Sequence, residues 1–266
     1  MNANYLNDVL TRRVKLIEEK FLRGEPPTVE RRYWRFSLSP HKTRTFLAFS
    51  CGCFLNCVFC YVNPKFLDPE LASGSFFTPS QVATKLVKAA FSKGFLKIGI
   101  SGGEPIIPGK AFQHLVSVLE NIEKLAPNLP VVVETNGIFL GLNDDLVYEL
   151  SRFNNLQVRV SFKGASPNEF SLLTGADPEL FDLTLEAVRN LVENAVNCSC
   201  ALMSSFSSEI SISKFIYSLR EISPLLVKNL EVETLILYPL TVKKLRKHKI
   251  KWREAIHPKK PPAEMI

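Results

Sequence analysis

The sequence predicts an α/β fold built on a parallel sheet. Six apolar, β-rich runs alternate with stretches of roughly ten to twenty residues that have helical spacing. Strands that alternate with helices pair in parallel, and their right-handed crossovers either curl the sheet into an open barrel or place helices on both faces. With 266 residues, of which 46% are hydrophobic, the chain is long enough to build one large domain with a sizeable core.

We expect the strands over 43–50, 96–101, 130–135, 156–162, 198–204 and 231–238. Helices are expected between them near 79–93, 109–126, 143–153, 178–195 and 211–221. Thr78-Pro79 and Asp177-Pro178 are each typical of a helix N-cap followed by Pro in the first turn. Ahead of the first strand, residues 4–22 have the apolar spacing of an amphipathic helix, and residues 31–36 predict an edge strand or a covering arm.

Composition and cysteine usage indicate a cytoplasmic protein with no membrane partner. No apolar run approaches the roughly 18 residues that cross a bilayer, and the first twenty residues are rich in charge where a secretory segment would be apolar. Four of the six cysteines crowd into one loop, which is not a disulfide pattern and requires a reducing compartment to keep the thiols reduced.

The net charge of the chain is concentrated at its C-terminal end. From Val242 onward nine Lys or Arg residues face only two acids, so this segment carries +7, which is the net charge of the whole chain. Basic side chains mixed with Leu245, Ile250 and Trp252 fit a surface that binds phosphates beside an aromatic ring that stacks on a base. A solvated basic terminus and a surface for an acidic protein are the alternatives.

Residues 51–60 contain the spacing that carries most chemical meaning. Cys53, Cys57 and Cys60 are separated by three and then two residues, so a short loop can wrap three thiolates around one corner of an iron-sulfur cluster. A [4Fe-4S] cluster held by three protein thiolates keeps one iron open for a substrate or cofactor. The spacing therefore predicts chemistry at this loop and not electron transfer alone.

Other interpretations of the cysteines remain open at this point. Structural zinc commonly uses two Cys-x-x-Cys pairs separated by a longer spacer, whereas here every candidate lies inside one loop. Cys51 is a candidate fourth ligand, although it ends an apolar run. Cys198 and Cys200 alternate along a predicted strand, which favours a role as small buried apolar residues.

The pattern Cys53-x-x-x-Cys57-x-Phe59-Cys60 resembles the signature of the radical S-adenosylmethionine (SAM) superfamily. The resemblance implies that a [4Fe-4S] cluster binds SAM and, after reduction by a flavodoxin or ferredoxin, cleaves it to a 5′-deoxyadenosyl radical that abstracts hydrogen from a substrate. It also implies an incomplete (β/α)6 TIM-like barrel, with the cysteine loop after the first strand and the active site at the C-terminal ends of the strands. We accordingly expect residues 1–42 to form an N-terminal helix and arm, 43–241 the barrel and 242–266 a basic tail.

Two further motifs follow predicted strands. Ser101-Gly-Gly-Glu-Pro105 gives two glycines that permit close backbone approach and a carboxylate on Glu104. Its position resembles that of the superfamily motif that contacts the amino group of SAM, so Gly102, Gly103 and Glu104 are expected at the cofactor. The third strand ends in Thr-Asn136-Gly, which resembles a motif of glycyl-radical-enzyme activating enzymes and of the related deazaguanine-forming enzymes; a simple turn is the alternative.

The fourth strand ends in Ser161-Phe-Lys163 and is followed by a Leu-Thr-Gly turn. This segment resembles pyruvate formate-lyase activating enzymes, in which the corresponding Lys reaches the cofactor; Ser161 stands where they carry Asp, which puts their cation site in doubt here. The sixth strand ends in Tyr238-Pro-Leu-Thr and lacks the His that follows in those enzymes. Resemblance to the superfamily covers about 43–240, and resemblance to the activating branch rests on the third and fourth strands.

The sequence thus predicts a radical SAM enzyme whose substrate is not encoded in any motif. A glycyl-radical-type protein, an RNA, a pterin or a deazapurine are all candidate substrates, and a macromolecule is expected to dock on the basic tail. The competing class is an iron-sulfur electron carrier without catalysis, which would not need Glu104.

Overall fold

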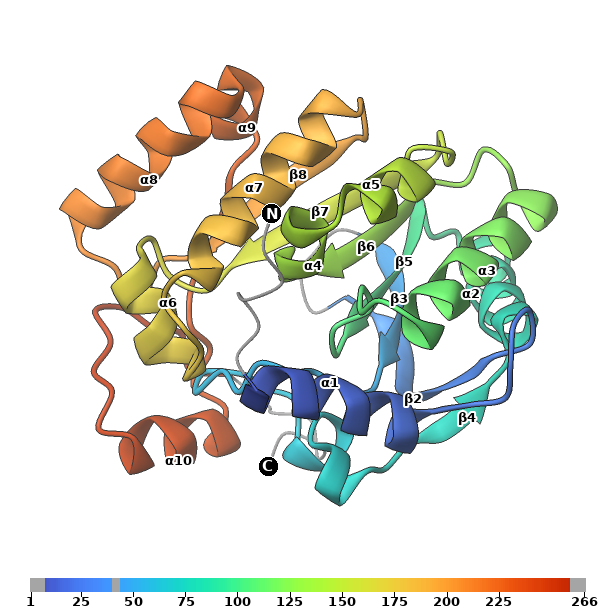
Figure 1. The fold of residues 1–266 in the computed structure, drawn as a ribbon, viewed down its shortest axis with the longest axis horizontal. Coiled ribbons are helices and arrows are strands. Elements are labelled where there is room, and N and C mark those ends of the chain that lie inside the picture. The colour runs from blue at the N-terminus through green and yellow to red at the C-terminus, as the bar shows by residue number, and fades with distance from the viewer. Residues whose placement is uncertain (1–7, 40–43, 259–266) are drawn as a thin grey trace.

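The computed structural model describes residues 8–39 and 44–258 and shows an open α/β barrel. Six parallel strands run side by side in chain order: β3 (Thr45–Ser50), β5 (Lys97–Gly102), β6 (Val131–Thr135), β7 (Leu156–Phe162), β8 (Cys198–Met203) and β9 (Glu231–Glu233). The connecting helices surround the strands (Figure 1): α2 (Pro79–Lys93), α3 (Lys110–Leu125), α4 (Ile138–Leu142), α5 (Asp144–Leu150), α7 (Leu180–Glu193), α8 (Glu209–Ile222) and α9 (Pro224–Lys228). The predicted incomplete (β/α)6 barrel is confirmed.

The segment before the barrel extends the sheet. Helix α1 (Asp8–Phe21) is followed by the short strand β1 (Leu22–Arg23) and by β2 (Glu30–Leu38), which pairs antiparallel with β3. Strand β4 (Ser75–Phe77) pairs with the other edge of β2. The predicted edge strand or arm over 31–36 is therefore a strand, while residues 4–7 of the predicted helix and residue 43 lie outside the described residues.

Local sequence signals account for several element boundaries, and two expectations were wrong. Thr78 caps α2 through a reciprocal capping box with Gln81. Asp177 does not cap α7, because its side chain accepts from the Glu179 amide and the helix begins at Leu180. The predicted strand over 231–238 ends at Glu233, since the chain there turns away from β8.

Some short elements had no prediction. They are the 3-10 turns η2 (Pro64–Phe66) and η3 (Pro69–Leu71) after the cysteine loop, and the helices α4, α6 (Pro167–Thr174), α9 and α10 (Pro239–Lys247). The expected helix at 143–153 is α5, which Asn143 caps through the Asp145 amide. No helix within the described ranges combines the length and the apolar character needed to cross a membrane.

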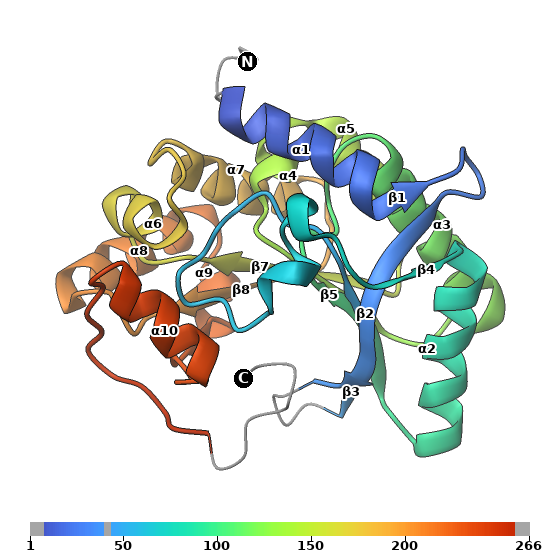
Figure 2. The same cartoon turned by 90° about the horizontal axis from the view of Figure 1, so that it is seen from below.

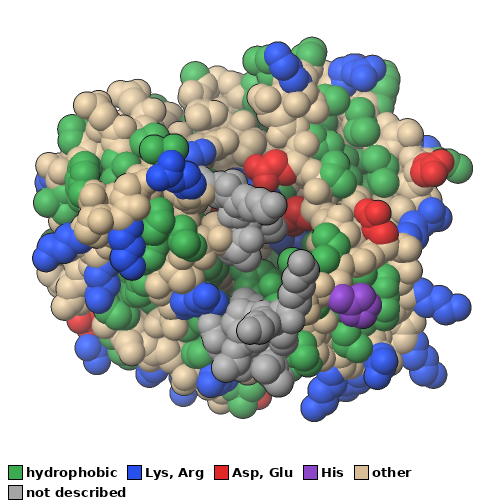
Figure 3. All heavy atoms as spheres, turned by 180° about the vertical axis from the view of Figure 1, so that it is seen from behind, with side chains coloured by type: hydrophobic (Ala, Val, Ile, Leu, Met, Phe, Trp, Pro, Cys, Tyr) green, Lys and Arg blue, Asp and Glu red, His purple; other side chains and the backbone are tan. Residues whose placement is uncertain are grey.

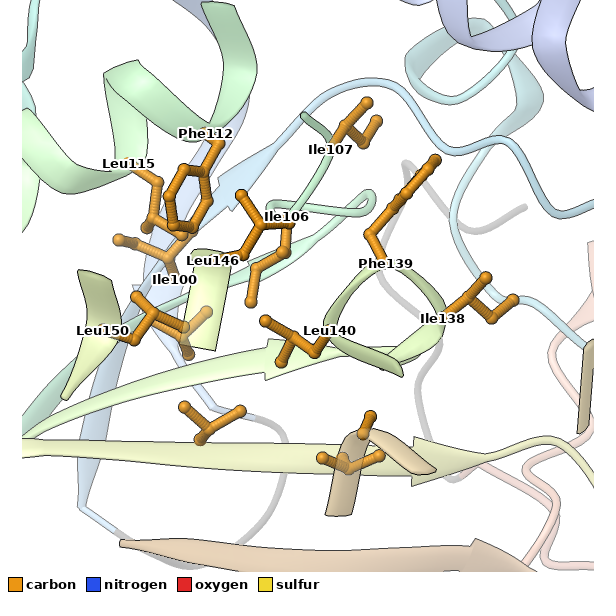
Figure 4. Close-up of a cluster of buried hydrophobic side chains, with 14 of the residues drawn as sticks. Ile100, Ile106, Ile107, Phe112, Leu115, Ile138, Phe139, Leu140, Leu146 and Leu150 are labelled. Carbon is orange, nitrogen blue, oxygen red and sulfur yellow. The ribbon is translucent and has the colours of Figure 1, made fainter. Parts of the chain in front are cut away.

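The part of the main core nearest the polar motifs lies between the sheet and the helices that follow the second and third barrel strands. It contains Ile100 of β5, Leu115 of α3 and Leu140 of α4, and the loop after β5 adds Ile106 between Ile100 and Leu140 and Ile107 beside Phe139 (Figure 4). These side chains are buried almost completely. Their packing fixes the carboxyl ends of β5 and β6, where the polar motifs lie.

The C-terminal segment packs on the barrel instead of extending from it. Helix α10 buries Leu245 against Val58 and Leu173, and Figure 2 shows it beside the cysteine loop. Farther along, Ile236 pairs in parallel with Ile256, so the segment runs along the open side of the sheet beyond β9. The boundary expected at residue 242 falls inside α10.

Gly141 tests how tightly α4 packs on α7. A Cβ atom at this position would lie 2.0 Å from the Leu183 carbonyl oxygen. Gly→Ala within a helix ordinarily stabilises a protein by about 0.5–1 kcal/mol, but overpacking costs about 1–3 kcal/mol. We therefore expect Gly141→Ala to lower the free energy of unfolding in urea denaturation, and a stabilised variant would contradict the packing described.

Candidate functional site

One cavity opens at the C-terminal ends of the barrel strands, and all ten predicted site residues line it. Four come from the cysteine loop, and the others lie at or just after the ends of the second, third and fourth barrel strands. The set comprises Cys53, Cys57, Phe59, Cys60, Gly102, Gly103, Glu104, Asn136, Ser161 and Lys163. The fold thus brings together side chains that are up to about one hundred residues apart in the chain, as expected for a barrel of parallel strands.

Backbone hydrogen bonds hold the cysteine loop on two sides. At the start of the loop, the Gly52 amide donates to the carbonyl of Phe66 in η2, and the Cys53 amide donates to the carbonyl of Leu67, which follows η2. The middle of the loop donates from Val58 to the Leu173 carbonyl at 2.9 Å, in the Leu-Thr-Gly turn that ends α6. The loop is therefore shaped by segments distant in sequence, and the Leu-Thr-Gly turn has a structural function here.

Two basic side chains bind carbonyls of the same loop. Arg13 of α1 donates from Nε to the Cys53 oxygen at 3.2 Å, and Lys244 of α10 donates from Nζ to the Cys60 oxygen at 3.1 Å. Both side chains line the cavity. Helices from opposite ends of the chain thus cover the cysteine loop, with positive charge beside the thiols.

The Gly-Gly-Glu loop rests directly on the backbone that leads into the cysteine loop. Gly103 donates to the Ser50 carbonyl at 2.7 Å, and Glu104 donates to the Gly52 carbonyl at 2.8 Å. A Cβ atom on Gly103 would lie 2.3 Å from the Gly52 oxygen, and Gly102 has a φ of 97°. Both glycines are needed for this contact between loops, whereas the sequence suggested a close approach to a ligand.

Arg31 of β2 connects the same two loops through hydrogen bonds. Its guanidinium donates from Nη2 to the carbonyl oxygens of Cys51 at 3.0 Å and Glu104 at 2.6 Å, and from Nη1 to that of Pro105 at 3.1 Å. The side chain is 1% exposed. A buried charge of this kind is stabilised only by such a set of acceptors, so Arg31 fixes the relative position of the cysteine loop and the Glu104 loop.

The Glu104 carboxylate is anchored to the end of β6. Oε1 accepts from the Thr135 hydroxyl at 2.6 Å and from the Ile106 amide, and Oε2 accepts from the Asn136 amide at 2.8 Å. Burial raises the pKa of Glu104, and these hydrogen bonds and the charge of Lys163 oppose the rise. The carboxylate is thus oriented before any ligand binds.

Asn136 presents an unsatisfied donor in this cavity. Its Oδ1 accepts from the Ile138 amide at 3.0 Å, which fixes the orientation of the side-chain amide. Its Nδ2 is buried and has no hydrogen-bond partner among the described residues. A buried donor without a partner costs about 1–3 kcal/mol, so this atom is placed to bind a ligand acceptor.

The end of β7 contributes a cation held in place. Lys163 donates from Nζ to the Ser161 hydroxyl at 2.6 Å. Phe59, across the cavity, packs against Phe206 with ring centroids 5.6 Å apart. The cavity thus contains a cation, a carboxylate, an amide donor and an aromatic ring close to three thiols.

Burial raises the pKa of the Cys53 and Cys57 thiols, to about 11 at Cys57, where Lys163 and Lys244 oppose the rise. No set of three His, Cys, Asp or Glu side chains within the described ranges meets around one metal ion.

Cys51 is buried in the core beside Gly74 and does not line the cavity. Cys200 is buried and Cys198 half-buried in the core, as the sequence predicted.

Several charged residues in or beside the cavity were not found from the sequence. Arg159 of β7 donates to Glu231 and Glu233 of β9, each at 2.8 Å, and lies 3.9 Å from Glu134. Arg159 lies in β7 two residues before Ser161, and it lines the cavity together with Glu134 and Glu233, whereas Glu231 is exposed outside it. The alternation of Arg159, Ser161 and Lys163 along one strand was the signal that could have found the first of them.

The donor set fits the cluster and cofactor implied by the cysteine pattern. Three thiols face one cavity, and next to them lie a preoriented carboxylate for an ammonium and an unpartnered amide donor. The backbone at Gly103 closes against the cysteine loop without space for a side chain. These residues supply ligands for iron and both kinds of polar partner for an amino acid moiety.

Comparison with known proteins identifies the family. A family model described as the radical SAM superfamily matches residues 47–205. The chain belongs to this superfamily. It is therefore an enzyme whose cofactors are a [4Fe-4S] cluster and SAM, and radical SAM enzymes require a reductant.

The similar proteins agree on the family and differ in chemistry. A probable GTP 3′,8-cyclase of Methanococcus aeolicus is 29% identical over 50% of this chain and 42% of its own length. A 7-carboxy-7-deazaguanine synthase of Methanothermobacter thermautotrophicus is 26% identical over 57% of this chain and 58% of its own. The chain thus spans about half the length of these relatives.

Solved structures show the same fold. A spore photoproduct lyase variant with a dinucleoside spore photoproduct superimposes with a TM-score of 0.55 at 15% identity, over 84% of this chain and 65% of that one. The open barrel is thus shared with radical SAM enzymes, and the partial resemblance to the activating branch is consistent with this shared fold.

Arg31→Lys should destabilise the contact between the two loops. Lysine offers one nitrogen in place of a planar fork, so at least one of the three carbonyls loses its partner. We expect the free energy of unfolding to fall by about 1–3 kcal/mol per unpaired carbonyl, together with lower cluster absorbance after anaerobic reconstitution.

Arg32→Lys is the matched control, because the neighbouring Arg32 donates to the Gly74 carbonyl and does not reach the cavity. It should load the cluster normally. Equal cluster loading in both variants would show that Arg31 does not position the loops.

Proposed function

We propose that this protein cleaves SAM reductively at a [4Fe-4S] cluster held by Cys53, Cys57 and Cys60 and uses the product to abstract hydrogen from a macromolecular substrate. The observation that carries the proposal is the convergence of ten predicted residues on one cavity. When bound and reduced by one electron, the cluster and SAM supply a 5′-deoxyadenosyl radical.

The residues of the chain then bind and orient the cofactor. The Glu104 carboxylate accepts from its ammonium group, since Oε2 accepts only one hydrogen bond from the protein within the described residues. Asn136 and Lys163 offer N–H donors to its acceptor groups, while Ser161 and Phe59 line the rest of the site. Gly102 and Gly103 keep the Glu104 loop against the cysteine loop.

The substrate in this proposal is polyanionic, either a protein of the glycyl-radical type or an RNA. Residues 43–241 generate the radical, helix α1 within the N-terminal region 1–42 covers the cysteine loop, and the basic segment from residue 242 docks the substrate. A flavodoxin or ferredoxin supplies the electron. A small purine-like molecule is the second candidate, which the names of the cyclase and deazaguanine relatives favour.

Cys53→Ala should abolish both the iron-sulfur absorbance of the reconstituted protein and SAM cleavage by dithionite, because each thiolate holds one iron. Cys51→Ala is the control and should keep both, since Cys51 does not line the cavity. Zinc binding without uptake of iron and sulfide would reject the proposal. A cluster that forms without any SAM cleavage would indicate an electron carrier.

Glu104→Gln should weaken SAM binding to the cluster-loaded protein by about tenfold or more, because a charge-assisted hydrogen bond is worth about 1.5–3 kcal/mol. Titration calorimetry measures this directly. The free energy of unfolding of the variant is the control. If it is unchanged, weaker SAM binding results from the lost charge and not from a change in structure. An unchanged dissociation constant would remove Glu104 from the cofactor site.

A further inference from the structure

The basic C-terminal segment forms an ordered surface with a regular arrangement of charge. On α10, Lys243, Arg246 and Lys247 follow helical spacing and are exposed, while Leu245 is buried. After the helix, the exposed residues Lys249, Lys251 and Arg253 alternate with the half-buried Ile250 and Trp252. We name these six exposed side chains the basic strip. Both halves of it turn their apolar residues toward the same core cluster.

The basic strip has no acidic partners in the described structure. None of its six cations forms a salt bridge to a described residue, and no Asp or Glu lies between residues 243 and 253. Lys and Arg side chains follow the lower right border in Figure 3, the side on which α10 lies. Six unpaired charges on a packed scaffold attract a polyanion at little cost in ordering the protein.

The strip is directly connected to the cavity. Lys244 lies between strip residues on α10, lines the cavity and donates to the Cys60 carbonyl. Tyr238, which precedes the helix, also lines the cavity and faces Tyr61 across 6.2 Å. A chain bound on the strip therefore reaches the mouth of the cavity.

Two carboxylates line the deep wall of the cavity. Glu134 and Glu233 lie beside the guanidinium of Arg159, which Glu231 also contacts from its exposed position outside the cavity. An acidic side chain entering here would meet these two carboxylates in a partly desolvated site. A nucleobase is neutral, has apolar faces for the tyrosine rings, and carries N–H groups that carboxylates accept.

We propose that the basic strip binds the phosphates of a single-stranded nucleic acid and that one base enters the cavity between the tyrosines and the carboxylates. This inference rests on the proposed function and decides between its two macromolecular substrates. A nucleotide chain offers phosphates for the strip and a flat, neutral ring with N–H donors for the cavity, whereas a segment rich in Asp or Glu offers carboxylates to both. Trp252, which the sequence offered as a stacking platform, packs on the core, and Tyr61 and Tyr238 take that role.

The test uses the cluster-loaded, SAM-bound enzyme and fluorescein-labelled 12-nucleotide single strands of RNA and of DNA. Anaerobic anisotropy titrations at several salt concentrations give the dissociation constant and its salt dependence. We expect the affinity to fall with salt by a log-log slope of about −0.7 per phosphate contacted. A lower dissociation constant for the RNA strand than for the DNA strand would show that the protein contacts the ribose 2′-hydroxyl.

The strip variant carries Arg246→Gln, Lys247→Gln and Lys251→Gln, and the control carries Lys88→Gln, Lys93→Gln and Lys124→Gln on exposed positions of α2 and α3. Both lose three charges. The strip variant should bind at least about tenfold more weakly, with a slope less steep by about 2, and the control should bind like wild type. An equal loss of affinity in both variants would show that binding depends only on the net charge of the protein, and this would overturn the proposal.

A peptide of twelve glutamates is the competitor that separates a nucleic acid from an acidic protein. It should displace the labelled strand poorly, and displacement as strong as that by unlabelled RNA or DNA would overturn the proposal in favour of a protein. Dithionite-driven SAM cleavage should be unchanged in the strip variant. If the wild-type protein does not cleave SAM with dithionite, the proposed function itself is rejected, whether or not the protein binds nucleic acid.

Discussion

The candidate site depends on one close backbone contact between two loops. The chain leaving β3 and the chain leaving β5 touch at Gly52 and Gly103, where a Cβ atom on Gly103 would lie 2.3 Å from the Gly52 oxygen. Two amide hydrogen bonds close the contact, and the buried guanidinium of Arg31 binds carbonyls on both sides of it. Thiols and carboxylate are brought together because parallel neighbouring strands end at the same edge of the sheet. The glycines set how close the two loops come.

The inside of the barrel is unusually polar for a packed fold, and this follows from its being open. Closed barrels fill their interior with layers of branched apolar side chains. Here β7 turns Arg159, Ser161 and Lys163 inward, and the acids of β6 and β9 compensate the buried guanidinium. Burial lowers the pKa of Arg159 and its acidic partners raise it, with the partners prevailing. The charge is retained, and the interior can bind polar groups.

Both ends of the chain contribute to the site although neither contains its motifs. Helix α1 covers Gly52 with Ile17 and Phe21 and places Arg13 on the cysteine loop. Helix α10 packs on the other side of that loop and reaches it through Lys244. These two helices limit solvent access to the thiols, which a reactive site requires.

The sequence by itself predicted the parallel sheet, most helix positions and the shared edge of the sheet at which the cysteine, Gly-Gly-Glu, Asn-Gly and Ser-Phe-Lys motifs lie. Periodicity carries this information, since apolar residues at strand or helix spacing mark which face is buried, and motifs at strand ends must share one edge of a parallel sheet. Only the tertiary structure showed that Arg31, in a run of basic and aromatic residues without clear alternation, is buried beneath the loops, and that Glu134 and Glu233 meet Arg159. It also decided that β9 ends at Glu233 and that Trp252 faces the core. The physical reason is that burial of a polar side chain is determined by partners distant in sequence, whose carbonyls and carboxylates leave no periodic trace in the chain.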